Sequence, residues 1–238
     1  LERLGVPKNH ITIIIALGTH ADLLPQTFAG LAGDYCARHL RILNSANTNK
    51  DRLTYIGTTS RKTDLYITKE ACDSDHVIIF GGVLHHMAAG YGGGRKYILP
   101  GIAGFDSIQQ NHSLTIQDNG SAHPMVAQGI LNGNPVSEDM EEASTLFLKD
   151  KTCTYAAVAA NGSGALFYAD AGDLGPTFST ACKKLDRACC VSLDKKADLA
   201  VISTGGHRTD TQLYHSTKSL FNAATAVKEQ SSNTLISD

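Results

Sequence analysis

Residues 85–112, HHMAAGYGGGRKYILPGIAGFDSIQQNH, combine three kinds of chemically useful group. Imidazoles stand at both ends of the stretch, and imidazole serves as an acid, a base or a metal ligand near neutral pH. Between them, Gly92–Gly94 leads directly into Arg95 and Lys96. Glycine lets the backbone approach a ligand closely, and adjacent cations attract an anion. The stretch therefore predicts a binding place for a flat, anionic molecule.

Two familiar glycine-rich motifs do not fit this stretch. A P-loop has glycine directly before its lysine and Ser or Thr after it, whereas Lys96 lies between Arg95 and Tyr97. A dinucleotide-binding fingerprint counted from Gly90 and Gly92 needs a glycine where Arg95 stands. Taken alone, the stretch is equally compatible with a glycine-rich surface turn whose lysine and arginine are solvated.

Composition limits the possible partners. The 238 residues are 42% apolar and 18% charged, which supports a packed core. The formal net charge of −2 gives no broad basic surface, so we expect small-molecule partners and no nucleic acid. The sequence shows no secretory signal, no apolar run of membrane length and no CxxC or zinc-like cysteine spacing. These features predict a reduced, cytoplasmic protein without membrane contact, with Cys189 and Cys190 buried in packing.

Strand-like and helix-like stretches alternate along the chain, a pattern typical of α/β proteins. The β-branched run at 10–17 predicts a buried parallel strand that ends at Gly18-Thr19-His20, the kind of position where α/β proteins bind ligands. A second such strand, at 76–84, leads directly to His85 and His86. The other expected elements are strands at 40–43, 53–57, 64–68 and 197–204, a hairpin turning at Asn161-Gly162, and a helix near 176–190.

The chain is expected to contain parts of two α/β domains. We place a cofactor-binding domain at 1–192 and the beginning of a second domain at 193–238. The opening LERLGVPKN has the composition of the last turn of a helix, with Gly5 and Pro7 as its stop. The final NTLISD has the composition of a strand that is just starting. We therefore expect a chain truncated at both ends.

Five motifs, in order across nearly the whole chain, resemble those of the nickel-pincer lactate racemase family. They are ALGTH at 16–20, HMAAGYGGGRKYILPGI at 86–102, NH at 111–112, NPVSEDMEEA at 134–143 and GGHRTDTQLYHSTK at 205–218. The resemblance implies two α/β domains with mainly parallel sheets and an active site in the cleft between them. It also implies a racemase or epimerase of 2-hydroxy acids.

The resemblance implies a covalent cofactor. In this family the lysine of the glycine-rich motif is bonded to a nickel-pincer nucleotide, a pyridinium-3-thioamide-5-thiocarboxylic acid mononucleotide. Lys96 would be that attachment point, Gly92, Gly93 and Gly94 would approach the planar cofactor, and His112 would complete the nickel coordination. Neutral imidazole and soft sulfur donors suit nickel, whereas a hard cation would want carboxylates. Cofactor-synthesis enzymes would be transient partners.

The resemblance also makes His20 and His86 the acid/base pair. One base for each enantiomer would take the substrate hydroxyl proton while hydride leaves the α-carbon. His85 stands where the family usually has proline, so we assign it no role and expect a packing or loop position. The distance along the chain to Lys96 favours His86 over its neighbour as the base.

Substrate recognition is expected at the fifth motif. Lys218 matches a family lysine that pairs with the substrate carboxylate, and His215 stands where lactate-specific relatives carry glutamine. Imidazole at this position predicts a 2-hydroxy acid that is larger or more oxygenated than lactate. A family arginine that precedes ALGTH has no counterpart in the chain.

Two other functions remain open from the residues. Clustered histidines also occur in zinc-type metal-dependent hydrolases, although neither an HExxH motif nor a nearby carboxylate ligand accompanies them here. A non-catalytic metal- or nucleotide-binding domain is the other alternative. Nickel with an adduct on Lys96 would indicate the racemase, and zinc without an adduct would indicate the hydrolase. Absence of both metals would indicate the binding domain.

Overall fold

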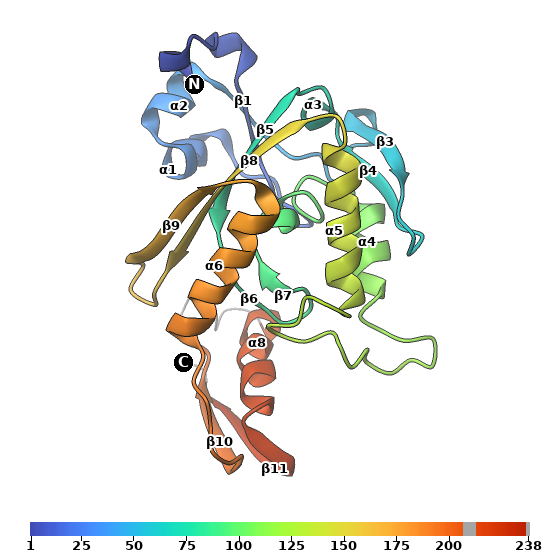
Figure 1. The fold of residues 1–238 in the computed structure, drawn as a ribbon, viewed down its shortest axis with the longest axis vertical. Helices are drawn as coiled ribbons and strands as arrows, with labels where there is room; N and C mark the ends of the chain where they lie inside the picture. The colour runs from blue at the N-terminus through green and yellow to red at the C-terminus, as the bar shows by residue number, and fades with distance from the viewer. Residues whose placement is uncertain (207–212, 237–238) are drawn as a thin grey trace.

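The largest sheet has three strands in the order β5-β8-β9. The computed structural model describes residues 1–206 and 213–236, with only the backbone described for Tyr214, His215 and residues 229–236. Strand β5 (His76–Gly82) runs parallel to β8 (Thr152–Ala160), and β9 (Leu166–Gly172) runs antiparallel to β8. Helix α6 (Leu174–Cys189) packs along β8 and β9 (Figure 1).

Strand alternation and helical periodicity explain this packing. On β8, Tyr155, Ala157 and Ala159 are buried at every second position, as a strand with one covered face requires. The buried residues of α6 follow the spacing of one helix face and are Thr177, Phe178, Ala181, Cys182 and Leu185.

Two-stranded sheets and short helices surround this layer. One parallel pair is β1 (Thr12–Ile15) with β2 (Arg41–Asn44), joined through α1 (Phe28–Ala32) and α2 (Asp34–His39). The antiparallel pairs are β3 (Leu53–Thr58) with β4 (Asp64–Thr68), which α3 (Lys69–Cys72) follows, and β6 (Leu84–His86) with β7 (Gly90–Gly92). After β7 come the 3-10 turn η5 (Gly94–Tyr97) and two helices that pack together, α4 (Phe105–Ser113) and α5 (Pro135–Leu148).

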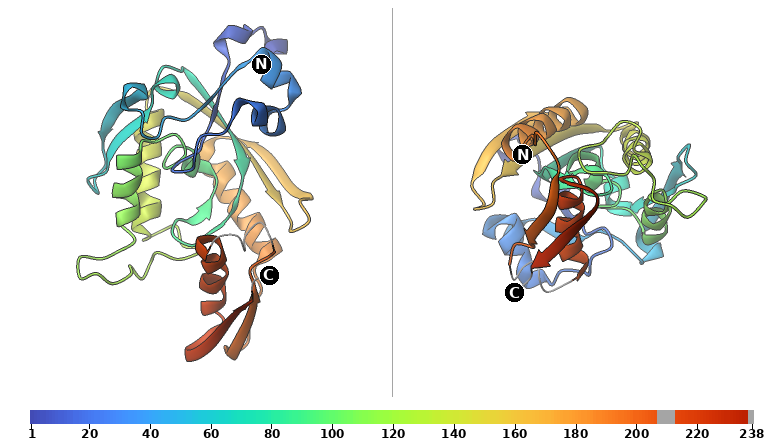
Figure 2. Two further views of the ribbon diagram at one scale, coloured as in Figure 1. Left: turned by 180° about the vertical axis from the view of Figure 1, so that it is seen from behind. Right: turned by 90° about the horizontal axis from the view of Figure 1, so that it is seen from below.

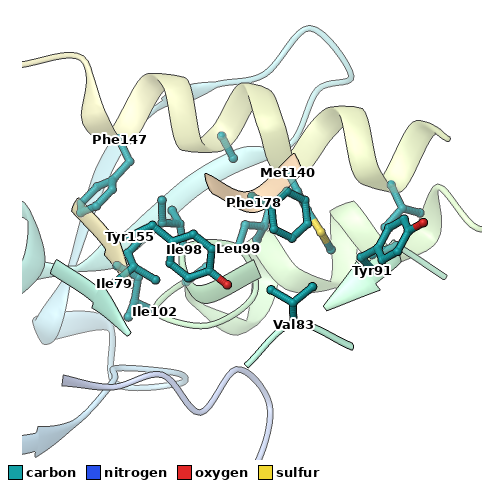
Figure 3. Packing of buried hydrophobic residues seen from close by; sticks show 14 of the residues in the cluster. Ile79, Val83, Tyr91, Ile98, Leu99, Ile102, Met140, Phe147, Tyr155 and Phe178 are labelled. Carbon is teal, nitrogen blue, oxygen red and sulfur yellow. The ribbon is translucent and has the colours of Figure 1, made fainter. Parts of the chain in front are cut away.

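One hydrophobic core joins these elements. Figure 3 shows Ile98 and Leu99, which follow η5, among Tyr155, Met140 and Phe178. These three side chains come from β8, α5 and α6. The turn that carries Lys96 is therefore held by a core drawn from segments far apart in the sequence.

The last part of the chain forms a βαβ unit. It consists of β10 (Ala197–Ser203), α8 (Leu213–Ala224) and β11 (Val227–Ile236), and its two strands are parallel. Figures 1 and 2 show this unit at the opposite end of the molecule from β1 and β2. Residues 190–196, between α6 and β10, form no helix or strand. The domain boundary expected after residue 192 falls in this segment and stays a prediction.

The expected mixture of helices and strands is confirmed, but the expectation of mainly parallel sheets is wrong. Among the described strands, three pairings are parallel and three are antiparallel. The connections 59–63, 87–89 and 161–165 are too short for a crossover, so the strands on either side of each must be antiparallel. The hairpin expected at Asn161-Gly162 is one of these three.

Two further expectations differ from the structure. Strand β1 is shorter than expected and only half-buried, because it belongs to a sheet of two strands. Cys189 and Cys190 are exposed rather than buried, since they lie where α6 ends beyond the core.

Within the described ranges, no helix is both long and apolar enough to cross a lipid bilayer.

Candidate functional site

Lys96 lies in the short 3-10 turn η5 and is half-buried. Its amide donates to the Gly93 carbonyl (3.1 Å), and its carbonyl accepts from the Gly101 amide (2.9 Å). Burial, more than any other cause, lowers the pKa of Lys96 to about 8, and the charges of Lys218 and Arg95 act in the same direction. The neutral, nucleophilic amine is therefore more abundant near neutral pH than for an ordinary lysine.

Arg95 anchors this turn to two helices. Its side chain is only 5% exposed. It donates to the Ser137 hydroxyl (2.6 Å) and to the Glu141 carboxylate (3.3 Å) of α5, and it lies 4.9 Å from the centre of the Phe178 ring of α6. Because a buried guanidinium needs such partners, they determine where the neighbouring Lys96 is held.

The glycines before Lys96 are required by internal packing. A Cβ on Gly93 would come within 2.6 Å of the Gly82 carbonyl oxygen, and one on Gly94 within 2.6 Å of the Phe178 ring. Both residues have positive φ angles, +95° and +55°, which side chains disfavour. A Cβ on Gly92 would lie 3.2 Å from Leu84. The expected contact of these glycines with a cofactor stays a prediction.

His86 ends β6, and its Nδ1 atom is held by the backbone. The amides of Ala88 and Ala89 donate to Nδ1 (3.2 and 3.1 Å), so the neutral ring carries its proton on Nε2. Burial lowers the pKa of His86 to about 3, and the charges of Lys96 and Lys218 add to the effect. His86 is therefore neutral at physiological pH.

His112 has the opposite tautomer. It lies in the last turn of α4, and its Nδ1 is 2.8 Å from the Ile108 carbonyl oxygen. A carbonyl only accepts, so Nδ1 carries the proton and Nε2 keeps its lone pair. Burial lowers the pKa of His112, and the charge of Lys96 lowers it further. A neutral imidazole oriented in this way is the usual form of a metal-binding histidine.

Two asparagines hold these histidines in place. Asn111, fully buried next to His112, donates to the Val136 carbonyl (3.2 Å) and the Asp139 carboxylate (2.8 Å), which ties α4 to α5. Asn134 caps α5 and also donates to the Ala88 carbonyl (2.8 Å) in the loop after His86. Sequence reasoning did not identify these roles, although both residues lie within the motifs that carry the family resemblance.

Lys218 reaches this region from α8. It lies close enough for its charge to lower the pKa of both His86 and Lys96. We call Lys218, Lys96, His86 and His112 the basic cluster. Its two lysines bring positive charge to one place, which favours an anion. The side chain of His215, expected near Lys218, lies outside the described residues.

His20 lies in the loop that follows β1. Its amide donates to the Leu17 carbonyl (3.1 Å), and the Gly18 amide donates to the Gly101 carbonyl (3.0 Å). The loop therefore lies against the segment that follows Lys96, while the His20 side chain is exposed. The structure thus groups His86, His112 and Lys218 around Lys96 and brings the backbone near His20 to the same segment.

His85 takes part in a second group, which sequence reasoning missed. Its Nε2 lies 2.9 Å from the Asp186 carboxylate, which also accepts from the Tyr91 hydroxyl (2.7 and 2.9 Å). The Cys190 sulfur lies 3.6 Å from the same Nε2. The only local signal is the four-residue spacing of Asp186 and Cys190, which places both on one side of the end of α6.

The chain is similar in sequence to known lactate racemases. The family model described as the lactate racemase N-terminal domain matches residues 1–123, slightly more than half of the chain. The lactate racemase of Thermoanaerobacterium thermosaccharolyticum is 28% identical over 224 residues, which cover 92% of this chain and 50% of the relative. The lactate racemase of Lactiplantibacillus plantarum is 26% identical over 224 residues, covering 94% of this chain and 51% of the relative.

Two solved structures have a similar fold. The lactate racemase apoprotein from Thermoanaerobacterium thermosaccharolyticum has a TM-score of 0.86 at 28% identity, over 96% of this chain and 52% of that one. A Thermotoga maritima protein has a TM-score of 0.61 at 18% identity, over 80% of this chain and 50% of that one, a likeness of fold alone. The chain spans about half the length of the curated relatives it matches. By its sequence match and its fold, the chain belongs to the lactate racemase N-terminal domain family.

Proposed function

We propose that the protein containing this chain is an isomerase that racemises or epimerises a 2-hydroxy acid by reversible hydride transfer. The observation that carries the proposal is the basic cluster, in which an amine of lowered pKa lies beside two neutral imidazoles and a second lysine. Such a cluster suits an anionic cofactor and a carboxylate substrate. Membership of the lactate racemase N-terminal domain family supports the same reaction class.

The residues fit a nickel-pincer nucleotide held on Lys96. The lowered pKa of Lys96 favours acylation of its amine, and the lone pair on Nε2 of His112 suits nickel. The positive charge of the cluster matches the phosphate and thiocarboxylate groups of such a cofactor. The chemistry that the group supplies when bound is the reversible acceptance of a hydride from the substrate α-carbon.

The protein's own residues would bind the substrate and move its hydroxyl proton. Lys218 would pair with the carboxylate as a point charge, and His86 and His20 would exchange the hydroxyl proton on opposite sides. Nε2 of His86 carries a proton in the described conformation, so this ring first donates to the substrate oxygen. Accepting a proton at Nε2 requires the ring proton to move to Nδ1, with loss of its two amide hydrogen bonds.

Bound anions would adjust His86 to this task. The pKa of His86 is lowered first by burial and then by neighbouring positive charges. An anionic cofactor and a substrate carboxylate would offset those charges and raise the pKa toward its ordinary value. Proton exchange near neutral pH would then begin only when the site is filled.

The substrate and the partners are part of the proposal. His215 in place of glutamine favours an acid larger or more oxygenated than lactate, with the His215→Gln variant as its test. Cofactor-synthesis enzymes would be transient cytoplasmic partners. A zinc-type hydrolase is less consistent with the site, because the charges that act on His86 and Lys96 come, among the residues that the structure describes, from basic side chains. A non-catalytic cofactor-binding role remains the second alternative.

Isotope tracing in D2O tests the reaction. The full-length protein, co-expressed with the cofactor-synthesis enzymes, is incubated with one enantiomer of each of several 2-hydroxy acids. Hydride transfer predicts racemised product without deuterium at the α-carbon, and a slower rate when the substrate carries deuterium there. Incorporation of solvent deuterium at the α-carbon would instead indicate proton abstraction, and absence of turnover with every acid would support the non-catalytic alternative.

A further inference from the structure

The three side chains His85, Asp186 and Cys190 form a compact group outside the basic cluster. One ligand atom from each lies within 4.8 Å of the others. His85 Nε2 is 2.9 Å from Asp186 Oδ1 and 3.6 Å from Cys190 Sγ, and the sulfur is 3.9 Å from the same carboxylate oxygen. From these distances and donor types we infer that the group is a binding site for one zinc ion.

The triangle of donor atoms has the size that tetrahedral zinc requires. Zinc bonds of about 2.0 Å to nitrogen and oxygen and about 2.3 Å to sulfur place tetrahedral ligands about 3.3 Å (N···O), 3.6 Å (N···S) and 3.5 Å (S···O) apart. The three separations in the structure lie within about 0.4 Å of these values. Small rotations of these side chains would complete the match.

The donor set also selects the metal. Imidazole nitrogen and thiolate sulfur suit zinc, whereas magnesium and calcium prefer oxygen ligands alone. Carboxylate and thiolate together neutralise the charge of the ion, since binding replaces the thiol proton of Cys190 and releases it to solvent. The Asp186 side chain is 39% exposed, so water can supply the fourth ligand.

The surroundings orient two of the ligands. The Tyr91 hydroxyl donates to both oxygens of Asp186 (2.9 and 2.7 Å), and the Tyr91 ring lies 5.3 Å from that of His85. Such outer contacts are typical of protein metal sites. A Cys–His–Asp nucleophile is not indicated, because Cys190 and Asp186 contact the same ring nitrogen of His85 instead of opposite ones.

The position of the site suggests its purpose. His85 lies in β6, whereas Asp186 and Cys190 lie at the end of α6, where the segment 190–196 leads to β10. An ion bound there joins this end of the helix to the strand that carries His86. The inferred role of the ion is therefore structural: it connects the end of α6 to β6.

Metal titration of the full-length, tag-free, cofactor-free protein tests the site. Zn²⁺ should bind at one ion per chain and raise the thermal midpoint, while Co²⁺ should give tetrahedral visible absorption with a thiolate-to-cobalt band in the near ultraviolet. Cys190→Ser should abolish that band and weaken zinc binding by more than about 100-fold, since even loss of an outer contact typically costs 10- to 100-fold. Tyr91→Phe should weaken it by about tenfold.

Three variants distinguish zinc binding at this site from binding at the neighbouring thiol or in the basic cluster. Cys189→Ser, which removes the neighbouring thiol, should leave zinc binding and the cobalt spectrum unchanged. His85→Gln should weaken binding as Cys190→Ser does, and circular dichroism confirms that each variant is folded. His112→Ala, in the basic cluster, should bind zinc as the wild type does. Zinc binding that is absent, or that survives both Cys190→Ser and His85→Gln, would overturn the inference.

Discussion

His85 and His86 are neighbours in β6, yet they belong to two groups of opposite character. His86 lies in the basic cluster, where the charges of Lys96 and Lys218 act on it and the neutral ring of His112 lies nearby. His85 contacts the carboxylate of Asp186 and the sulfur of Cys190. Successive side chains of a strand point to opposite faces, so one short strand serves both groups.

The difference between the groups shows what each one lacks. The basic cluster contains two lysine ammonium groups, which attract an anionic cofactor and a carboxylate substrate. The group around His85 contains a carboxylate, a thiol and an imidazole nitrogen, which are donor types that bind a divalent cation such as zinc. Charge balance therefore predicts which kind of ligand each group binds, and the following variants test that division.

The largest expected effect comes from His112. In the full-length, cofactor-loaded protein, His112→Ala should lower turnover by more than about 100-fold, because loss of a ligand costs more than loss of an outer contact. Nickel content, measured by elemental analysis after desalting, should fall as well. His85→Ala should keep its nickel and most of its activity. Nickel loss in His85→Ala but not in His112→Ala would reverse the assignment of the two groups.

The second-largest effect on the reaction is expected from Lys218. Lys218→Gln removes the charge that would pair with the substrate carboxylate, and a hydrogen bond to a charged group contributes about 1.5–3 kcal/mol. Steady-state kinetics should show kcat/KM lowered by roughly 10- to 100-fold, mostly through KM. Lys218→Arg should lower kcat/KM less than Lys218→Gln does, because arginine keeps the positive charge. If Lys218→Gln has an unchanged KM, the lysine does not bind the substrate.

The resemblance of the motifs to those of the family singled out Lys96, His86, His112 and Lys218, and their functional roles stay predictions. The group around His85 was not found from the sequence. Long β-branched runs and the Asn161-Gly162 turn are local signals, so β5 and the β8–β9 hairpin could be predicted. His85 and Asp186 meet only because α6 packs over the sheet, and no local spacing reports such a contact. The sequence likewise indicated glycines near Lys96, but only the structure shows that Phe178 and Gly82 require them.

The stability of the cofactor-free protein in acid should depend on the lowered pKa of His86. Burial, with nearby positive charges, lowers its pKa from an ordinary 6.5 to about 3 in the folded state. Between these pH values the unfolded chain binds the extra proton, so stability rises with pH and is lost on acidification. Urea unfolding at several pH values gives the free energy of unfolding as a function of pH. The slope of that free energy against pH should be smaller in His86→Gln than in the wild type, by up to about 1.4 kcal/mol per pH unit. An unchanged slope would mean that His86 is not held neutral by the fold.

The smallest effect concerns the coupling of the two lysines. In the cofactor-free protein, competitive labelling with an amine reagent across a range of pH should give Lys96 a pKa of about 8. Lys218→Gln should raise that pKa by about half a unit, because it removes a nearby positive charge from an exposed position. Lys228→Gln, at an exposed lysine of β11, is the control and should leave the pKa unchanged. Equal effects of the two variants would show that Lys218 does not act on Lys96.

The mass of the peptide that contains Lys96 tests the central claim most directly. The full-length protein is co-expressed with the cofactor-synthesis enzymes, assayed for racemisation, digested and compared with Lys96→Arg, which keeps the positive charge but cannot form the same bond. We expect active wild-type protein to carry the cofactor mass on Lys96 and the variant to carry none and to be inactive. Active protein with an unmodified Lys96, or with the adduct on another lysine such as Lys218, would contradict the account.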